Sequence, residues 1–223
     1  LGINCETDGV EFIHNALLSS ETVWPEFEGK DILRHLQNKF NDNNKLITNG
    51  LRKPRLPDDS GKWHDDSWLV GSELLDNAKL IFPERNIVTA ANIGGTDVAT
   101  MAKQWILPVP CGPKFNDLVD KLRTMSTLGK TNVDKKELQA LWDLISGMPA
   151  INLLLSKEET NDFLIIIGSQ IIKLGELFIT NEESAPLIDD EETKGLSPLD
   201  ESSPLVEILE QTFKVINLND CKV

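Results

Sequence analysis

The sequence of 223 residues is poor in several features, and each shortage removes a class of protein. The three cysteines, Cys5, Cys111 and Cys221, are widely spaced and form no CxxC pair, which excludes a disulfide framework. No run of about 20 predominantly apolar residues occurs, so we expect no membrane-spanning helix. Basic residues are also few: 22 Lys and Arg face 36 Asp and Glu, a formal net charge of −14. This balance argues against a protein whose whole surface binds nucleic acid or an anionic membrane.

What is present fits a soluble globular protein. Hydrophobic residues make up 40% of the chain and charged residues 26%, and the length suits one large domain or two small ones. The first residues lack the basic start and apolar run of a signal peptide. Together with the unpaired cysteines, this start favours a reducing, cytoplasmic compartment.

Acidic residues are concentrated toward the C-terminus. Residues 131–223 carry 18 acidic and 7 basic side chains, whereas residues 1–130 carry 18 acidic and 15 basic ones. Within the acidic part, residues 181–203 contain eight acidic residues against a single Lys194, interspersed with Ser, Pro and Gly. Such a composition buries too little apolar surface to offset the entropy of ordering, so we predict an acidic flexible linker over 181–203.

A helical pattern follows this predicted linker. Ser203 suits an N-cap and Pro204 suits the first helical position, which predicts a C-terminal amphipathic helix over 204–217. A helix at the end of a linker must dock on its own domain, on a second copy or in a partner's groove. The predicted partner-binding residues are those of its apolar stripe: Leu205, Ile208, Leu209, Phe213 and Ile216.

Helical signals recur through the rest of the chain. Asp134 and Glu137 form a capping box ahead of an apolar stripe that includes Trp142. A second capping box, Ser156 to Glu159, precedes the apolar stretch 163–179, which we predict as a buried helix. Further helices are expected over 10–18, 31–40, 72–82, 97–105 and 115–125, loops over 41–68 and 83–95, and strands as alternatives over 163–167 and 87–89.

These patterns predict an all-α fold. We expect an irregular bundle of about 8–10 helices with little or no sheet, and a flexible acidic segment before a C-terminal amphipathic helix. The expected organisation is a helical domain over 1–180, divisible into lobes 1–110 and 111–180, then the linker 181–203 and the helix 204–217.

His35, His64 and Asp65 are weak metal-ligand candidates. With Asp117 or Asp120 further along, their order resembles the metal-binding pattern of the HD phosphohydrolase family, which is all-helical. The resemblance implies two imidazoles and two carboxylates that hold a divalent metal and activate water. The pair His64-Asp65, however, lies in a polar, loop-like stretch rather than an apolar helix, so we predict no metal and no other cofactor.

One dense basic cluster stands out: Arg52, Lys53 and Arg55. Trp63 and Trp68 follow it, and basic residues with aromatics bind single-stranded nucleic acid through phosphate contacts and stacking. These three residues are therefore the nucleic-acid-binding candidates, although acidic residues follow them at once and the net charge disfavours this partner.

No catalytic template is complete in the sequence, so no catalytic residue is predicted. The leading hypothesis is a non-catalytic helical protein–protein interaction or assembly protein, structural or adaptor in role. Its partner would be another protein or a second copy of itself, with no membrane involved. A helical RNA-binding or nucleocapsid-type protein that uses the Arg-bearing N-terminal part is the alternative, and a metal-dependent phosphohydrolase is the third hypothesis.

Overall fold

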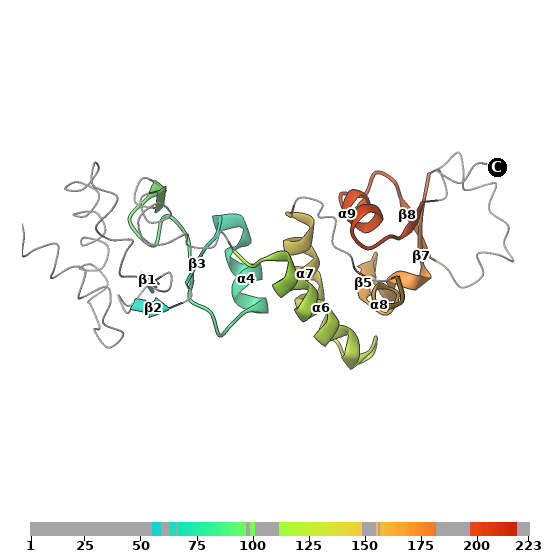
Figure 1. Ribbon diagram of the computed structural model, residues 1–223, viewed down its shortest axis with the longest axis horizontal. Coiled ribbons are helices and arrows are strands. Elements are labelled where there is room, and N and C mark those ends of the chain that lie inside the picture. The colour runs from blue at the N-terminus through green and yellow to red at the C-terminus, as the bar shows by residue number, and fades with distance from the viewer. Residues whose placement is uncertain are drawn as a thin grey trace, which may run out of the picture. The chain divides into compact units, whose positions relative to one another are not determined.

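The computed structural model of the chain divides into two compact units, Leu1–Lys114 (unit 1) and Phe115–Val223 (unit 2). Both units combine helices with small sheets (Figure 1), so the predicted all-α bundle with little or no sheet is wrong. The structure describes residues 55–58, 63–65, 67–96, 99–100, 112–148, 155, 157–181 and 197–217. The helices predicted over 10–18 and 31–40, and nearly all of that predicted over 97–105, lie outside these residues.

Unit 1 contains a hairpin and a β-α-β arrangement. Strands β1 and β2 pair antiparallel, while β3 and β4 pair parallel with a helix between them in sequence. The helix predicted over 72–82 is confirmed as η1 and α4, and β4 confirms the alternative strand reading of 87–89. Its elements are β1 (Arg55–Pro57), β2 (Trp63–Asp65), β3 (Trp68–Leu69), η1 (Ser72–Leu74), α4 (Leu75–Ile81) and β4 (Ile87–Val88).

Hydrogen bonds around the side chains of Ser67 and Asn86, here called the polar knot, join the two sheets of unit 1. The Ser67 hydroxyl accepts a hydrogen bond from the Leu56 amide at 3.1 Å and donates to the His64 carbonyl at 2.9 Å. The Asn86 side-chain amide donates to the Leu56 carbonyl at 3.1 Å and to the Ser67 hydroxyl oxygen at 2.9 Å. The regions 41–68 and 83–95, which were predicted as loops, therefore contain short strands. Hydrogen bonds of the Ser67 and Asn86 side chains join the ends of these strands, and a loop-like composition does not predict such contacts.

Unit 2 begins with two packed helices and continues with strands. The predicted helix stripes at 115–125 and after Asp134 are confirmed as α6 and α7. The Asp134 carboxylate caps α7 by accepting from the Lys136 amide at 2.7 Å and the Glu137 amide at 3.1 Å. The elements are α6 (Phe115–Leu128), α7 (Lys135–Ser146), α8 (Lys157–Thr160), β5 (Leu164–Ile167), β6 (Gln170–Lys173), η2 (Leu174–Glu176), β7 (Leu177–Thr180), β8 (Ser197–Asp200), α9 (Val206–Gln211) and β9 (Ile216–Asn217).

The apolar stretch 163–179, predicted as one helix, is instead a hairpin and a further strand. Where the sequence predicts a capping box over 156–159, the structure has only the four-residue helix α8. Isoleucines face each other across the hairpin, with Ile165 opposite Ile172 and Ile166 opposite Ile171. β-branched side chains suit such pairing, and Gly168, with φ of 60°, supplies the turn between the strands.

The last sheet has the order β8-β7-β9, with both outer strands parallel to β7. The central strand, Leu177–Thr180, is buried along its whole length. Strand β8 lies within the stretch 181–203 that was predicted as a linker, and residues 182–196 of that stretch are outside the described residues. The C-terminal helix is shorter than predicted, because it ends at Gln211 and a strand follows.

Candidate interaction site: the C-terminal segment of unit 2

Residues Ser197–Asn217, here called the C-terminal segment, complete the core of unit 2. The segment supplies β8 and β9, which pair with the two sides of β7, and it carries α9 between them. The rest of the described part of unit 2, residues 115–148, 155 and 157–181, is here called the body. Figure 1 shows the segment in red beside β7 and β5 of the body.

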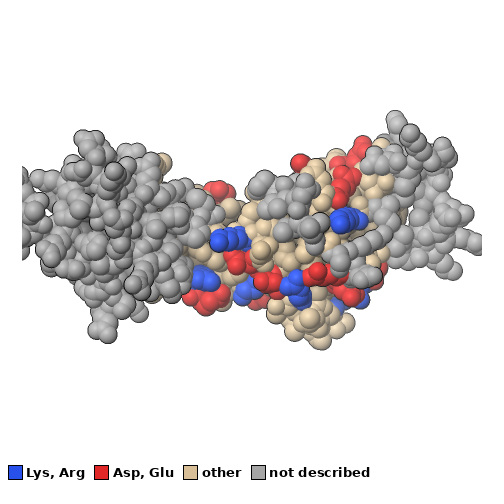
Figure 2. All heavy atoms as spheres, in the orientation of Figure 1, with Lys and Arg blue, Asp and Glu red and all other residues tan. Residues whose placement is uncertain are grey.

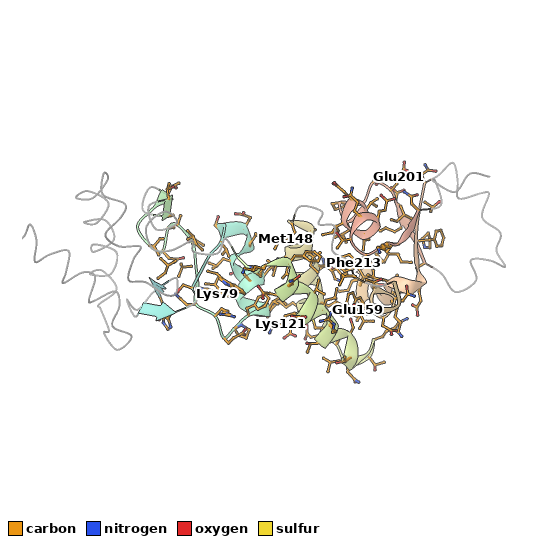
Figure 3. All side chains as sticks on the ribbon, viewed as in Figure 1. Lys79, Lys121, Met148, Glu159, Glu201 and Phe213 are labelled. Carbon is orange, nitrogen blue, oxygen red and sulfur yellow. The ribbon has the colours of Figure 1, made fainter. Side chains whose placement is uncertain are left out.

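Phe213 is a buried aromatic contact between the segment and the body. Its side chain, labelled in Figure 3, is 1% exposed. Its ring contacts three aromatic rings of the body. The ring centroids lie 5.5 Å from that of Trp142 in α7, and 6.1 Å from those of both Phe115 and Phe163. Tilted and edge-on aromatic contacts of this kind add to the free energy gained from burial.

The residues of the predicted apolar stripe differ in how deeply they are buried. Ile208 and Leu209 are buried, with Leu209 fully so, whereas Leu205 is half-buried. Ile216 is part of strand β9, where it lies opposite Phe178 in the parallel register. Of the five stripe residues, Ile208, Leu209 and Phe213 are therefore buried within the chain's own unit 2.

The chain turns sharply between α9 and β9. The Phe213 amide donates to the Ile208 carbonyl at 3.3 Å, and the Val215 amide donates to the Leu209 carbonyl at 3.0 Å. Lys214 adopts a positive φ of 55°, a conformation that is uncommon for a residue with a side chain. At this turn the chain changes from the helix α9 to the strand β9, whereas the helix predicted over 204–217 continues through it.

A surface pocket of about 360 Å³ is lined by residues of the body. Its wall includes Arg123, which pairs with Glu159, and Lys173, which donates to Asp162 at 2.6 Å. The hydrogen bond that Arg123 donates to Glu159 raises the pKa of Arg123, and the hydrogen bond that Lys173 donates to Asp162 raises the pKa of Lys173. Both cations are thus already neutralised by carboxylates, which gives the pocket no surplus charge for an anion.

A further ion pair strengthens the body beside η2. Lys130 donates to the Glu176 carboxylate at 2.6 Å, and the Lys173 amide donates to the same carboxylate at 3.2 Å. The hydrogen bond from Lys130 lowers the pKa of Glu176. Figure 2 shows that Lys and Arg alternate with Asp and Glu over the described part of the face that it draws.

The nucleic-acid candidates of unit 1 are only partly described. Arg52 and Lys53 lie outside the described residues, and Arg55 lies in β1 opposite Asp65 of β2. Trp68, expected as a stacking platform, is only 5% exposed. Its ring packs edge-on against that of Phe82, with the ring centroids 4.9 Å apart. The Arg85 guanidinium carbon lies over the Trp68 ring, 5.1 Å from its centroid. Trp68 thus serves the core of unit 1 and leaves no open face for a base.

The metal candidates fall in different places. His35 is outside the described residues, and Asp65 lies in β2. The His64 imidazole pairs with Asp58, with Nε2 and Oδ2 2.7 Å apart. The alternative carboxylates, Asp117 and Asp120, belong to α6 of unit 2. Across the described stretches of both units, no three His, Cys, Asp or Glu side chains group as a metal site would require.

No helix within the described ranges is long and apolar enough to cross a membrane. Comparison of the chain with protein-family models, with curated proteins and with solved structures found no match.

Proposed function

We propose that this chain is a non-catalytic protein–protein interaction or assembly protein, and that the C-terminal segment is its docking element. The observation that carries the proposal is the position of Phe213, which the segment inserts among three aromatic rings of the body. Buried aromatic anchors surrounded by apolar contacts are the usual source of affinity in protein interfaces.

The segment contacts the body in the way that a bound peptide contacts its receptor. Strands β8 and β9 add to the two sides of β7, while Leu209 of α9 is fully buried. Strand addition and a helix that buries its apolar face are two recurrent modes of peptide recognition. The acidic connection, residues 182–196, joins this docking element to the body.

Cutting the connection tests this proposal on the folded chain. A protease recognition sequence replaces residues 186–191, the purified protein is cleaved, and the products are analysed by gel filtration. We expect the two pieces to elute together at concentrations above about 1 μM, since a well-packed interface of this kind holds at micromolar affinity or better.

Two variants sharpen the cleavage experiment. Leu209→Asp places a carboxylate in an apolar contact and should separate the pieces after cleavage. Glu207→Gln, at an exposed position on the same helix, should leave them together. The proposal fails if the cleaved parent protein separates into two pieces while its uncut form is folded by circular dichroism.

A further inference from the structure

We propose that unit 1 binds a small organic phosphate in a surface pocket, with the phosphate group at Lys79 and Arg85 and the organic group against β4. The pocket has a volume of about 290 Å³, and its described lining residues all belong to unit 1. The inference goes beyond the proposed function, which concerns the C-terminal segment of unit 2, and each can fail without the other.

Two cationic side chains line this pocket. Lys79, labelled in Figure 3, is exposed in the last turn of α4. Arg85 follows the turn after α4, where its amide donates to the Phe82 carbonyl at 3.0 Å, and its guanidinium carbon lies 5.1 Å from the centroid of the Trp68 ring. Contact with an indole face orients a guanidinium and leaves the N–H groups at its edge able to donate to phosphate oxygens. The pocket therefore presents a positioned fork of donors beside a second positive charge.

The described wall of this pocket carries more positive than negative side chains. Asp58 supplies its carboxylate, and Asp58 Oδ2 lies 2.7 Å from His64 Nε2, so that oxygen is already engaged within the hairpin. In the pocket of unit 2, by contrast, two carboxylates match the two cations Arg123 and Lys173. Charge complementarity thus favours an anion in the pocket of unit 1. A phosphate monoester, with a charge of about −1.5 to −2 at pH 7, matches two cations better than a carboxylate does.

The same pocket has an apolar side. Pro83, Ile87 and Val88 line it, and the two strand residues are only 2% and 3% exposed. Inorganic phosphate gains nothing from such a surface, whereas an organic group attached to the phosphate is removed from water when it lies there. Small-molecule sites typically combine an apolar wall with a few charged groups that orient the ligand. The lining therefore points to a phosphate that carries an apolar body.

Titration of the full chain with phenyl phosphate tests the site. The backbone amide signals of Ile87 and Val88 in ¹H–¹⁵N NMR spectra report binding, and inorganic phosphate, phenol and benzoate are the comparison probes. We expect phenyl phosphate to bind about tenfold more tightly than inorganic phosphate, because the ring is buried against β4. Phenol, which lacks the charge, should not shift these amides, and benzoate, with one charge, should bind more weakly than phenyl phosphate.

Variants of the two cations assign the binding to this pocket. Lys79→Gln and Arg85→Gln should each raise the dissociation constant of phenyl phosphate about tenfold. Arg85→Lys keeps the charge but loses the planar fork, so its affinity should fall between those of the parent and Arg85→Gln. Lys136→Gln, which removes an exposed cation of α7 in unit 2, is the matched control and should bind as the parent does.

Asp58→Asn provides a change in the opposite direction. It removes the negative charge from the wall, so phenyl phosphate should bind more tightly. The proposal is overturned if about 10 mM phenyl phosphate leaves the Ile87 and Val88 amides of the parent unshifted, or if Lys79→Gln and Arg85→Gln bind as tightly as the parent. Tighter binding of benzoate than of phenyl phosphate would likewise overturn the assignment of the ligand as a phosphate.

Discussion

The rings of Phe213 and Trp142 lie 5.5 Å apart between centroids and are inclined at 56°. Trp142 belongs to the predicted stripe of α7, and Phe213 follows α9 near the end of the chain. The Trp142 indole also donates to the Leu164 carbonyl at 2.8 Å, so one side chain joins α7, β5 and the C-terminal segment. The stability of unit 2 should depend on this contact more than on any exposed ion pair of the body.

Changing Phe213 to Ala should lower the free energy of unfolding of unit 2 by about 3–5 kcal/mol, because it removes a buried ring and leaves a cavity. A double-mutant cycle with Trp142→Leu, which removes the ring, should give a coupling energy of about 0.5–1.5 kcal/mol in chemical denaturation. Additive effects of the two changes would show that the ring contact contributes nothing beyond burial.

Leu209→Asp should destabilise unit 2 by several kcal/mol, since an unpaired carboxylate would replace a fully buried apolar side chain. Glu207→Gln is the matched control and should be within about 0.5 kcal/mol of the parent. Glu210 is a poorer control, because it is half-buried and accepts a hydrogen bond from Asn217. Hydrogen exchange locates the effect: amides of β7 should lose protection in Leu209→Asp, and those of α4 should not.

Ser67→Ala should lower the stability of unit 1 by about 1–3 kcal/mol. The change leaves the buried Leu56 amide without its hydroxyl acceptor and removes one acceptor of the Asn86 amide. The measurement is hydrogen exchange at β1 and β3, with Ser72→Ala as the exposed control. Unchanged protection in Ser67→Ala would show that the polar knot does not hold the two sheets together.

Glu176 should make the stability of unit 2 depend on acidic pH. Its pKa is lowered in the folded state, so its contribution is complete above about pH 5 and is lost as pH falls through the folded pKa. Glu176→Gln should therefore be less stable than the parent at pH 7, by less than about 1 kcal/mol because the pair is partly exposed.

Thermal melts of both proteins from pH 7 to pH 3 check this prediction. The difference in melting temperature between parent and Glu176→Gln should shrink toward zero at the acidic end. A difference that stays constant over this range would mean that the carboxylate of Glu176 acts through packing and not through its charge.

The sequence determined the elements that depend on local spacing. The stripes of α6 and α7, the Asp134 cap and the helix after Ser72 were all predicted, because capping and the 3.6-residue period act within a few residues. The apolar stripe of the C-terminal segment was also predicted, and its residues Ile208, Leu209 and Phe213 are buried within unit 2.

Tertiary structure decided the rest, because strand pairing depends on residues that are distant in the chain. The isoleucines of β5 are compatible with either a buried helix or a strand. They form a strand because they pair with β6. The parallel pairing of β7 with β8 and β9 has no local signal, and it turned part of a predicted linker into sheet. Local composition specifies what a segment can form, whereas the surface it meets in the folded unit selects which form it takes.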